Sequence, residues 1–299
     1  MSNVYVVGSI NQDLVAMAPA LPRPGQTVMN GIFKIFPGGK GSNQAVAAAK
    51  AGTTTYLIGA TGQDDAARYM RDSLQQADVR SDYIQEVSEH TGVALITVAD
   101  GKNIITVCPG ANTAFDFPVV PFAAGDVLLA QFEIAQAVVM KAFQAAKAAG
   151  ATVLLNTAPA LELSDAMKAL CDIIILNEEE LADYVGDKAA SDNEGVKQQA
   201  IKLRVSPAQK IIVTLGARGL VCVDGDDVIV IKGHPVKAID STGAGDCFCG
   251  VLAASLAQKL FLHDALVRAN AAAAISVQRE GAASSMPSGA EIDAFIKAA

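Results

Sequence analysis

Residues 240–246 combine small residues with carboxylates in a spacing that could bind phosphate. They read DSTGAGD, and an apolar, alanine-rich run follows them. Glycines let the backbone turn tightly into a helix, whose first amide N–H groups are unpaired and carry the positive end of the helix dipole. Such a place binds anions, phosphate above all, and Asp246 beside it could accept a proton. The alternative is a glycine-rich turn in which Asp246 only caps the helix.

Neither of the two common phosphate-binding loops fits this stretch. A dinucleotide-binding fingerprint would need a third glycine at Phe248, and a Walker A loop would need Gly-Lys-Ser/Thr after a four-residue spacer. The chain contains neither pattern. An anion site at residues 240–246 would therefore be of another kind.

A second glycine-rich stretch, at residues 37–45, reads PGGKGSNQA. Its glycines precede an expected helix capped by Ser42, and Lys40 and Asn43 add a cation and an amide that suit a polar ligand at close backbone approach. Asn11 and Asp13 follow the first expected strand and share one side of an extended segment. The alternatives are a loop with a solvated lysine and an Asx turn.

The charge and the N-terminal residues exclude several classes of protein. The chain has 299 residues and a net charge of −8, with a pI near 4.9. This acidic balance argues for a soluble protein and against non-specific binding to nucleic acid or to an acidic membrane. The first residues lack the basic region of a signal peptide, and no uncharged apolar run approaches the roughly 18 residues that span a bilayer. We therefore expect a cytoplasmic protein.

Cysteine and histidine usage fits the same expectation. The five cysteines are odd in number and form no C-x-x-C pair, as is typical of a reducing compartment. We expect all five in the core. The three histidines are isolated in the sequence, which argues against a zinc cage or a Ser-His-Asp triad.

The alternation of short β-branched runs with alanine-rich helical stretches is typical of a doubly wound α/β fold with a mostly parallel sheet. We expect a single α/β domain over residues 1–299, because the chain contains no linker or repeat. Expected strands cover residues 4–8, 54–59, 127–130, 152–156, 173–176, 210–215, 220–223 and 228–231. Expected helices cover residues 42–51, 64–77, 244–258, 262–277 and 289–297, with others between the middle strands.

Two segments break this alternation and predict a small second sheet. Residues 19–37 are rich in proline and glycine, with β-like pieces at 26–29 and 31–36. Residues 93–99 and 103–108 read as two strands joined by Asp100-Gly101, which favours a hairpin turn. Because open α/β sheets bind ligands at their carboxyl edge, we expect these segments, at about 14–38 and 91–110, to form a β-sheet lid there.

Several short stretches, taken in order, resemble the ribokinase family of sugar kinases, also called the phosphofructokinase-B family. The two signature stretches are GGKGSN at 38–43 and DSTGAGD at 240–246. Intermediate matches are GSINQD at 8–13, TGVALI at 91–96, QFE at 131–133, NTAPA at 156–160, NEEE at 177–180, TLGARG at 214–219 and REGA at 279–282. The resemblance covers nearly the whole chain, and within the family it is greatest to members that phosphorylate ribose.

The resemblance implies a ribokinase-like fold with a small lid and assigns roles by position. Asp246 would be the base, and the amides of Gly243, Ala244 and Gly245 the anion hole. Residues that would hold the sugar are Asn11, Asp13, Gly39, Lys40, Asn43, Glu133 and Asp246. Residues that would line the ATP site are Asn177, Glu180, Thr214, Gly216, Gly245 and Asn270, with Glu180 in a motif that influences Mg²⁺ and phosphate. Residues that match a monovalent-cation (K⁺) site are Asp240, Thr242, Ser276, Arg279, Gly281 and Ser285.

The reaction implied is transfer of the ATP γ-phosphoryl group to the primary hydroxyl of a small sugar, D-ribose first, by a homodimer joined through the lid. Alternatives are a kinase for 2-deoxyribose, another sugar or a nucleoside. A non-catalytic sugar-binding protein is a further alternative, but it would not need Asp246 and the anion loop. At the cation site, the alternative is an ion pair between Asp240 and Arg279, which needs no ion.

Overall fold

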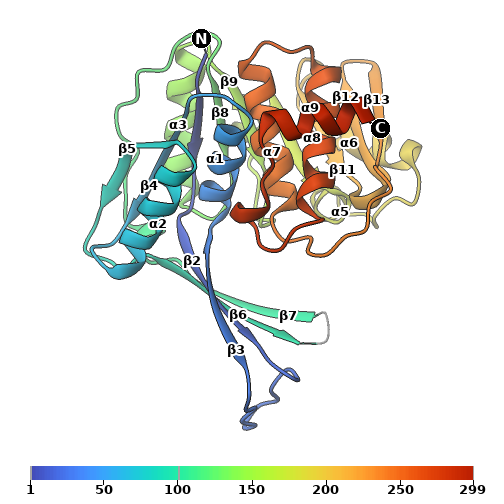
Figure 1. The fold of residues 1–299 in the computed structure, drawn as a ribbon. Coiled ribbons are helices and arrows are strands. Elements are labelled where there is room, and N and C mark those ends of the chain that lie inside the picture. Colours follow the sequence, from blue (N-terminus) through green and yellow to red (C-terminus); the bar gives the residue numbers. More distant parts are fainter. Residues whose placement is uncertain (1, 100–101, 299) are drawn as a thin grey trace.

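The computed structural model describes residues 2–99 and 102–298. Within these residues, nine strands form a central sheet in the order β13-β12-β11-β10-β9-β8-β1-β4-β5 (Figure 1). They are β1 (Val4–Val7), β4 (Thr55–Thr61), β5 (Val79–Glu86), β8 (Val127–Ala130), β9 (Thr152–Asn156), β10 (Ile173–Asn177), β11 (Lys210–Thr214), β12 (Gly219–Asp224) and β13 (Asp227–Lys232). All pair in parallel except β12 and β13, which add an antiparallel edge. The mostly parallel sheet expected from the sequence is confirmed.

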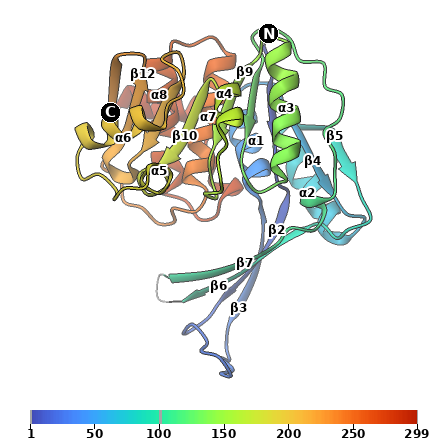
Figure 2. The same ribbon diagram turned by 180° about the vertical axis from the view of Figure 1, so that it is seen from behind.

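Helices cover both faces of this sheet, which is why its central strands are runs of buried Val, Ile and Leu. One layer contains α1 (Lys40–Lys50), α2 (Asp65–Gln76), α7 (Ala244–Ala257), α8 (Leu262–Ser276) and α9 (Gly289–Ala298). The other contains α3 (Gln136–Ala148), α4 (Asp165–Leu170), α5 (Glu178–Val185) and α6 (Asn193–Leu203) (Figure 2). The side chains of β1 alternate accordingly: Val4 and Val6 belong to the core under the first layer, and Tyr5 and Val7 to the core under the second.

A second sheet has the order β3-β2-β6-β7 and projects from the body where β1 leads into β2 (Figure 1). Its strands are β2 (Asn11–Met17), β3 (Ile32–Gly38), β6 (Gly92–Ala99) and β7 (Lys102–Cys108). The expected strand at residues 26–29 is wrong, because this proline- and glycine-flanked segment lies in the loop between β2 and β3. The expected turn at Asp100-Gly101 lies outside the described residues.

Two strands were not expected. Polar residues interrupt the alternation at the start of β2, and β5 carries charges because it lies at the edge of the central sheet. In β2, Asn11 pairs in register with Gly38 on β3 and with Gly92 on β6. The polar side chains after β1 therefore begin the second sheet, where it joins the body.

The second sheet leaves many large apolar side chains exposed: Met17, Ile32, Phe33, Ile35, Leu95, Ile104, Ile105 and Val107. Cys108 lies on its edge strand β7 and is only half-buried, so the expectation of a core position is wrong for this cysteine. The other four cysteines are buried, and all five are free thiols.

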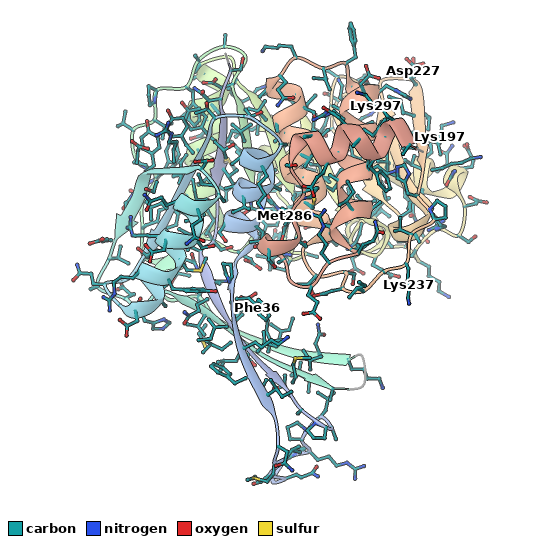
Figure 3. The ribbon with its side chains drawn as sticks, in the orientation of Figure 1. Phe36, Lys197, Asp227, Lys237, Met286 and Lys297 are labelled. Atoms are coloured by element: carbon teal, nitrogen blue, oxygen red, sulfur yellow. The ribbon has the colours of Figure 1, made fainter. Side chains whose placement is uncertain are left out.

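The root of the second sheet touches the loop that follows α8. The ring of Phe36 on β3 (Figure 3) lies beside Gly281, since a Cβ built there would meet it at 3.7 Å. Lys34 pairs with Glu280 at 3.6 Å. A shift of β3 would therefore move the contacts that this loop makes with Phe36 and Lys34.

None of the described helices is long and apolar enough to cross a membrane.

Candidate active site

Helix α7 begins in the stretch predicted to bind phosphate. Gly243 precedes it with φ 74°, a left-handed conformation that glycine adopts without strain. A Cβ at Gly243 would also lie 2.8 Å from the Cβ of Ala282. Within the described part of the chain, the N–H groups of Gly243, Gly245 and Asp246 have no acceptor, whereas the Ala244 N–H donates to Ser241 O at 3.2 Å. The start of α7 thus presents unpaired amides, as an anion site requires.

These amides lie where two pockets meet. The first pocket carries charged and amide side chains, including Lys40, Asn177, Glu180 and Asp246. The second is mostly apolar. Residues that line it include Gly216, His234, Phe248, Asn270 and Val277. Thr214, Ser241, Ala244 and Gly245 line both, so the pockets are continuous. All the residues predicted to line a nucleotide site therefore border one or both pockets.

Two of these residues are held by local hydrogen bonds at the start of α5. Asn177 Oδ1 accepts from the Glu180 N–H at 2.8 Å, and Glu180 Oε2 accepts from the Asn177 N–H at 2.9 Å. This reciprocal pair is a capping box. In the apolar pocket, Asn270 Nδ2 donates to Lys232 O at 2.9 Å.

Asp246 is buried in the first turn of α7 and is held by two amides of α1. Asn43 Nδ2 donates to its Oδ2 at 3.0 Å, and Gln44 Nε2 donates to its Oδ1 at 2.9 Å. Burial raises the pKa of Asp246, while the charge of Lys40 and the two amides oppose this effect. In return, the charge of Asp246 raises the pKa of Lys40, so the lysine remains a cation in the pocket. A carboxylate with a raised pKa suits the role of a proton acceptor.

The start of α1 lies against the turn between β1 and β2. Gly39 has φ 87°, and a Cβ there would lie 2.8 Å from the backbone N of Asn11. The helix begins at Lys40, so the prediction that Ser42 caps it is wrong: Ser42 lies inside the first turn and its Oγ donates to Gly38 O. The Lys40 N–H donates instead to Glu133 Oε2 at 3.0 Å, and Ser9 Oγ donates to the same oxygen.

Asp13 brings a third carboxylate to the site. Burial raises its pKa to about 7, with further contributions from Glu133 and Asp246. Its carboxylate fits against Gly38, where any Cβ would overlap it. Lys40 is the cation beside two of these carboxylates, because the charges of Asp246 and Glu133 both raise its pKa. Asp13, Lys40, Asn43, Glu133 and Asp246, which the sequence places far apart, therefore come together.

Asn11 is positioned by a residue that sequence reasoning missed. Asn112 follows β7, and its Nδ2 donates to Asn11 Oδ1 at 2.7 Å while its Oδ1 accepts from the Ile10 N–H at 2.9 Å. The Asn11 amide therefore presents its Nδ2, which donates to no acceptor among residues 2–99 and 102–298, as the donor for a ligand. Gln44 was also missed; its only sequence signal was its place after Asn43 in a motif stretch. A single sequence contains no signal for Asn112.

The predicted cation residues lie in two adjacent segments, one before α7 and one that runs from Ser276, the last residue of α8, to Ser285. Asp240 accepts from the N–H groups of Thr242 and Gly281, both at 2.9 Å. The alternative of an Asp240–Arg279 ion pair is wrong, because Arg279 pairs with Glu291 at 2.6 Å. Ser276 Oγ donates to Ala273 O within α8 at 2.9 Å, and Ser285 Oγ donates to Ala282 O at 2.7 Å. Among the described residues, no hydrogen bond reaches the carbonyls of Asp240, Thr242, Arg279 and Gly281.

Comparisons with known proteins identify the family of this chain. The chain matches the model of the pfkB family of carbohydrate kinases over residues 1–289. It is 38% identical over 299 residues to the ribokinase of Haemophilus influenzae, with 98% of this chain and 97% of the relative covered. It is 32% identical over 302 residues to the deoxyribokinase of Salmonella typhi, with 98% of each covered.

The fold is also similar to that of a carbohydrate kinase of known structure. The structure of Arabidopsis thaliana ribokinase complexed with ribose and ATP superposes with a TM-score of 0.90 at 29% identity, over 99% of each chain. The matches to the family model, to the relatives and to the solved structure each cover nearly the whole chain. The chain therefore belongs to the pfkB family of carbohydrate kinases.

Proposed function

We propose that this protein is an ATP-dependent ribose kinase, which transfers the γ-phosphoryl group of ATP to the primary hydroxyl of D-ribose and forms ribose 5-phosphate. The observation that carries the proposal is the place of Asp246: a buried carboxylate at a helix start with unpaired amides, where an apolar pocket meets a charged one. Phosphoryl transfer mainly requires positioning and charge stabilisation, with one group to take the hydroxyl proton. The ribokinase relative and the neighbour that binds ribose and ATP support the choice of substrate.

In this mechanism Asp246 accepts the proton of the primary hydroxyl while that oxygen attacks the γ-phosphorus, and the bond from the γ-phosphorus to the oxygen of ADP breaks. The unpaired N–H groups of Gly243 and Gly245 stabilise the charge on the transferring phosphoryl oxygens. Lys40 lines the same pocket and remains protonated, so it balances the negative charge that gathers there.

The sugar would bind between β2 and the start of α1. Asp13 accepts hydrogen bonds from ring hydroxyls, and Asn11 Nδ2 donates, because Asn112 occupies its Oδ1. Asn43 Oδ1 has no partner among the described residues and is available to accept a further hydroxyl. Glu133 fixes the start of α1 through the Lys40 N–H. This donor and acceptor set suits a polyhydroxylated ligand.

ATP would place its base in the apolar pocket, beside Gly216 and Asn270, and its phosphates at the start of α7. The described residues contain no group of three or more His, Cys, Asp or Glu side chains that could hold a metal ion. Mg²⁺, however, commonly binds through ATP phosphates plus one or two carboxylates. Glu180, which lines the phosphate-side pocket, fits that role, and bound Mg²⁺ would supply charge neutralisation there.

A K⁺ ion would bind between the segments before α7 and after α8, which Asp240 joins by accepting from the N–H groups of Thr242 and Gly281. Large, weakly hydrated cations suit a cage of main-chain carbonyls with one carboxylate, and four such carbonyls accept no hydrogen bond in the described structure. The loop at Thr242–Gly243 leads directly into the anion site. A cation held by Asp240, Thr242, Arg279, Gly281 and Ser285 would therefore fix the direction of the amides that face phosphate. Ser276 fits less well, because its hydroxyl donates within α8.

The second sheet would act as the lid and as the contact between two copies of the chain. Its exposed apolar side chains form a surface of the kind that marks protein–protein contacts. A lid that closes over the sugar excludes water, which competes as phosphoryl acceptor. The five free thiols are consistent with the cytoplasm as the site of action.

The test is ADP release with a panel of acceptors: D-ribose, 2-deoxyribose, a ketohexose and a nucleoside. If Asp13 accepts a hydrogen bond from the 2-hydroxyl, the absence of that hydroxyl in 2-deoxyribose should cost about 1–3 kcal/mol. The value of kcat/KM for 2-deoxyribose should then be lower than for ribose by about 5- to 150-fold. Equal kcat/KM for both sugars would favour the deoxyribokinase relative's activity instead. If none of the acceptors in the panel is phosphorylated, the remaining interpretation is a non-catalytic sugar-binding protein.

A further inference from the structure

Behind Asp246, three amide side chains form a buried chain of hydrogen bonds. Gln131 Nε2 donates to Gln44 Oε1, and Gln44 Nε2 donates both to Asp246 Oδ1 at 2.9 Å and to Asn156 Oδ1 at 3.1 Å. Asn156 Nδ2 donates in turn to Ile175 O at 3.3 Å. Gln44 and Gln131 are fully buried, and Asn156 is nearly so. Solvent therefore offers Gln44 and Gln131 no alternative partners.

This chain fixes the orientation of the Gln44 amide. Rotating it by 180° would set Oε1 against two acceptors, Asp246 and Asn156, and both would lose their donor. Asn43 differs, because its Oδ1 has no partner among the described residues while its Nδ2 donates to Asp246 Oδ2. The Asn43 amide can thus still bind a ligand through Oδ1, whereas the orientation of the Gln44 amide is fixed by its hydrogen bond to the Asp246 carboxylate.

We propose that Gln44 is the positioning residue of the proton acceptor: it holds Oδ1 of Asp246, so that Oδ2, on the side of Asn43, faces the sugar hydroxyl. Gln44 touches neither substrate and acts only through Asp246. Its N–H also stabilises the ionised carboxylate in a buried site. The inference rests on the proposed role of Asp246 as base.

The other groups that face Asp246 define what Gln44 adds. Lys40 at the start of α1 favours the ionised carboxylate, while Glu133 after β8 and Asp13 on β2 disfavour it. Glu180 on α5 acts on Lys40, and burial raises the pKa of the Cys247 and Cys249 thiols on α7, which keeps them neutral. The hydrogen bond from the Gln44 N–H lowers the pKa of Asp246, and so opposes the effect of burial, even when no ligand is bound. A hydrogen bond to a charged group is strong enough that its loss should raise the pKa of Asp246 by about one to two units.

The test is the pH dependence of kcat in Gln44→Met, which keeps the length of the side chain but removes the amide. The acid limb of the profile should move to higher pH by about one to two units, kcat should recover at alkaline pH, and KM for ribose should stay within about threefold. Gln44→Glu places a second carboxylate beside Asp246 and should move the limb further.

Gln209→Met is the matched control. Gln209 is also buried, and its Nε2 also donates to two acceptors, Lys168 O at 2.6 Å and Cys171 O at 2.9 Å. It lines neither pocket. This variant should lose stability to a similar extent and leave the pH profile unchanged.

Gln131→Met provides a second route, since it removes the donor to Gln44 Oε1, and so loosens the Gln44 amide, without touching Asp246. It should move the acid limb in the same direction by a smaller amount, and it keeps the proposal testable if Gln44→Met does not fold. An unshifted acid limb in the folded variants of Gln44 would overturn the proposal. A normal kcat in Asp246→Asn would instead overturn the proposed function itself.

Discussion

Replacing Asp246 by asparagine removes the proton acceptor while it keeps the shape of the side chain. In the structure, Gln44 Nε2 donates to Asp246 Oδ1 and Asn43 Nδ2 donates to Oδ2, at 2.9 and 3.0 Å. The new carboxamide can present its oxygen to the locked Gln44 amide. Its NH₂ group would then face the NH₂ group of Asn43, an unfavourable pairing of two donors.

Asn43 can relieve this conflict. Its Oδ1 has no hydrogen-bond partner in the described part of the chain, so turning its amide by 180° costs no existing bond from that oxygen and restores a donor–acceptor pair. A buried neutral amide also avoids the desolvation of a carboxylate. We therefore expect Asp246→Asn to fold with a free energy of unfolding close to that of the wild type.

Catalysis should respond very differently. Loss of a positioned base should lower kcat by about 10²- to 10⁴-fold, which corresponds to about 2.7–5.5 kcal/mol in the activation free energy. Ribose affinity should change little, because Asn11, Asp13 and the start of α1 remain in place, and the turned Asn43 amide offers its Nδ2 as a donor to the hydroxyl in place of Oδ1. The residual rate should also lose the acid limb that titration of Asp246 gives to the wild-type profile.

The assay combines steady-state ADP release, ribose binding by calorimetry and thermal unfolding. Asp126→Asn is the matched control, because Asp126 is a buried carboxylate that accepts from the Asn3 and Ala123 N–H groups and lines neither pocket. This control should lower the unfolding temperature and leave kcat unchanged. A near-normal kcat in a folded Asp246→Asn variant would refute the assignment of the base.

Ribose affinity without ATP should weaken about tenfold for each pH unit below the Asp13 pKa of about 7, because only the ionised carboxylate accepts hydroxyl hydrogen bonds fully. Calorimetry should show this slope in the wild type and a flat profile in Asp13→Asn; a flat wild-type profile would contradict it. At constant ionic strength, kcat should be higher in K⁺ than in Na⁺ or a bulky organic cation, since a misaligned amide costs about 2.7–4 kcal/mol in the transition state. Asp240→Asn should remove this difference, and equal wild-type rates in all three salts would argue against the cation site. If the second sheet joins two copies of the chain, Ile105→Asp on that sheet should convert the proposed dimer to a monomer in sedimentation velocity, whereas Val228→Asp, at an exposed position of β13, should not. A monomeric wild type would refute the dimer.

Local features of the sequence were enough to predict most of the fold. Runs such as those of β1, β8 and β10 predicted buried parallel strands, because both faces of such a strand need apolar side chains. The glycines before Lys40 and before α7 predicted tight helix starts, and both adopt positive φ. The motif stretches also contain several of the residues that line the two pockets. These features depend on the preferences of neighbouring residues, which a sequence records directly.

What only the tertiary structure decided is which partner each polar group has. Ser42 resembled a helix cap but lies within the first turn of α1, and Arg279 pairs with Glu291 rather than Asp240. Strand β2 begins with polar residues that do not look like a strand in the sequence, and only their pairing with Gly38 on β3 and Gly92 on β6 shows that they belong to one.

The amide chain behind Asp246 joins residues of α1, α7, β9 and the segment after β8, and no spacing in the sequence brings these together. Hydrogen bonds are short and directional, so their partners depend on where the packed elements place each side chain. A pKa such as that of Asp13 depends in the same way on burial and on charges contributed from distant parts of the chain.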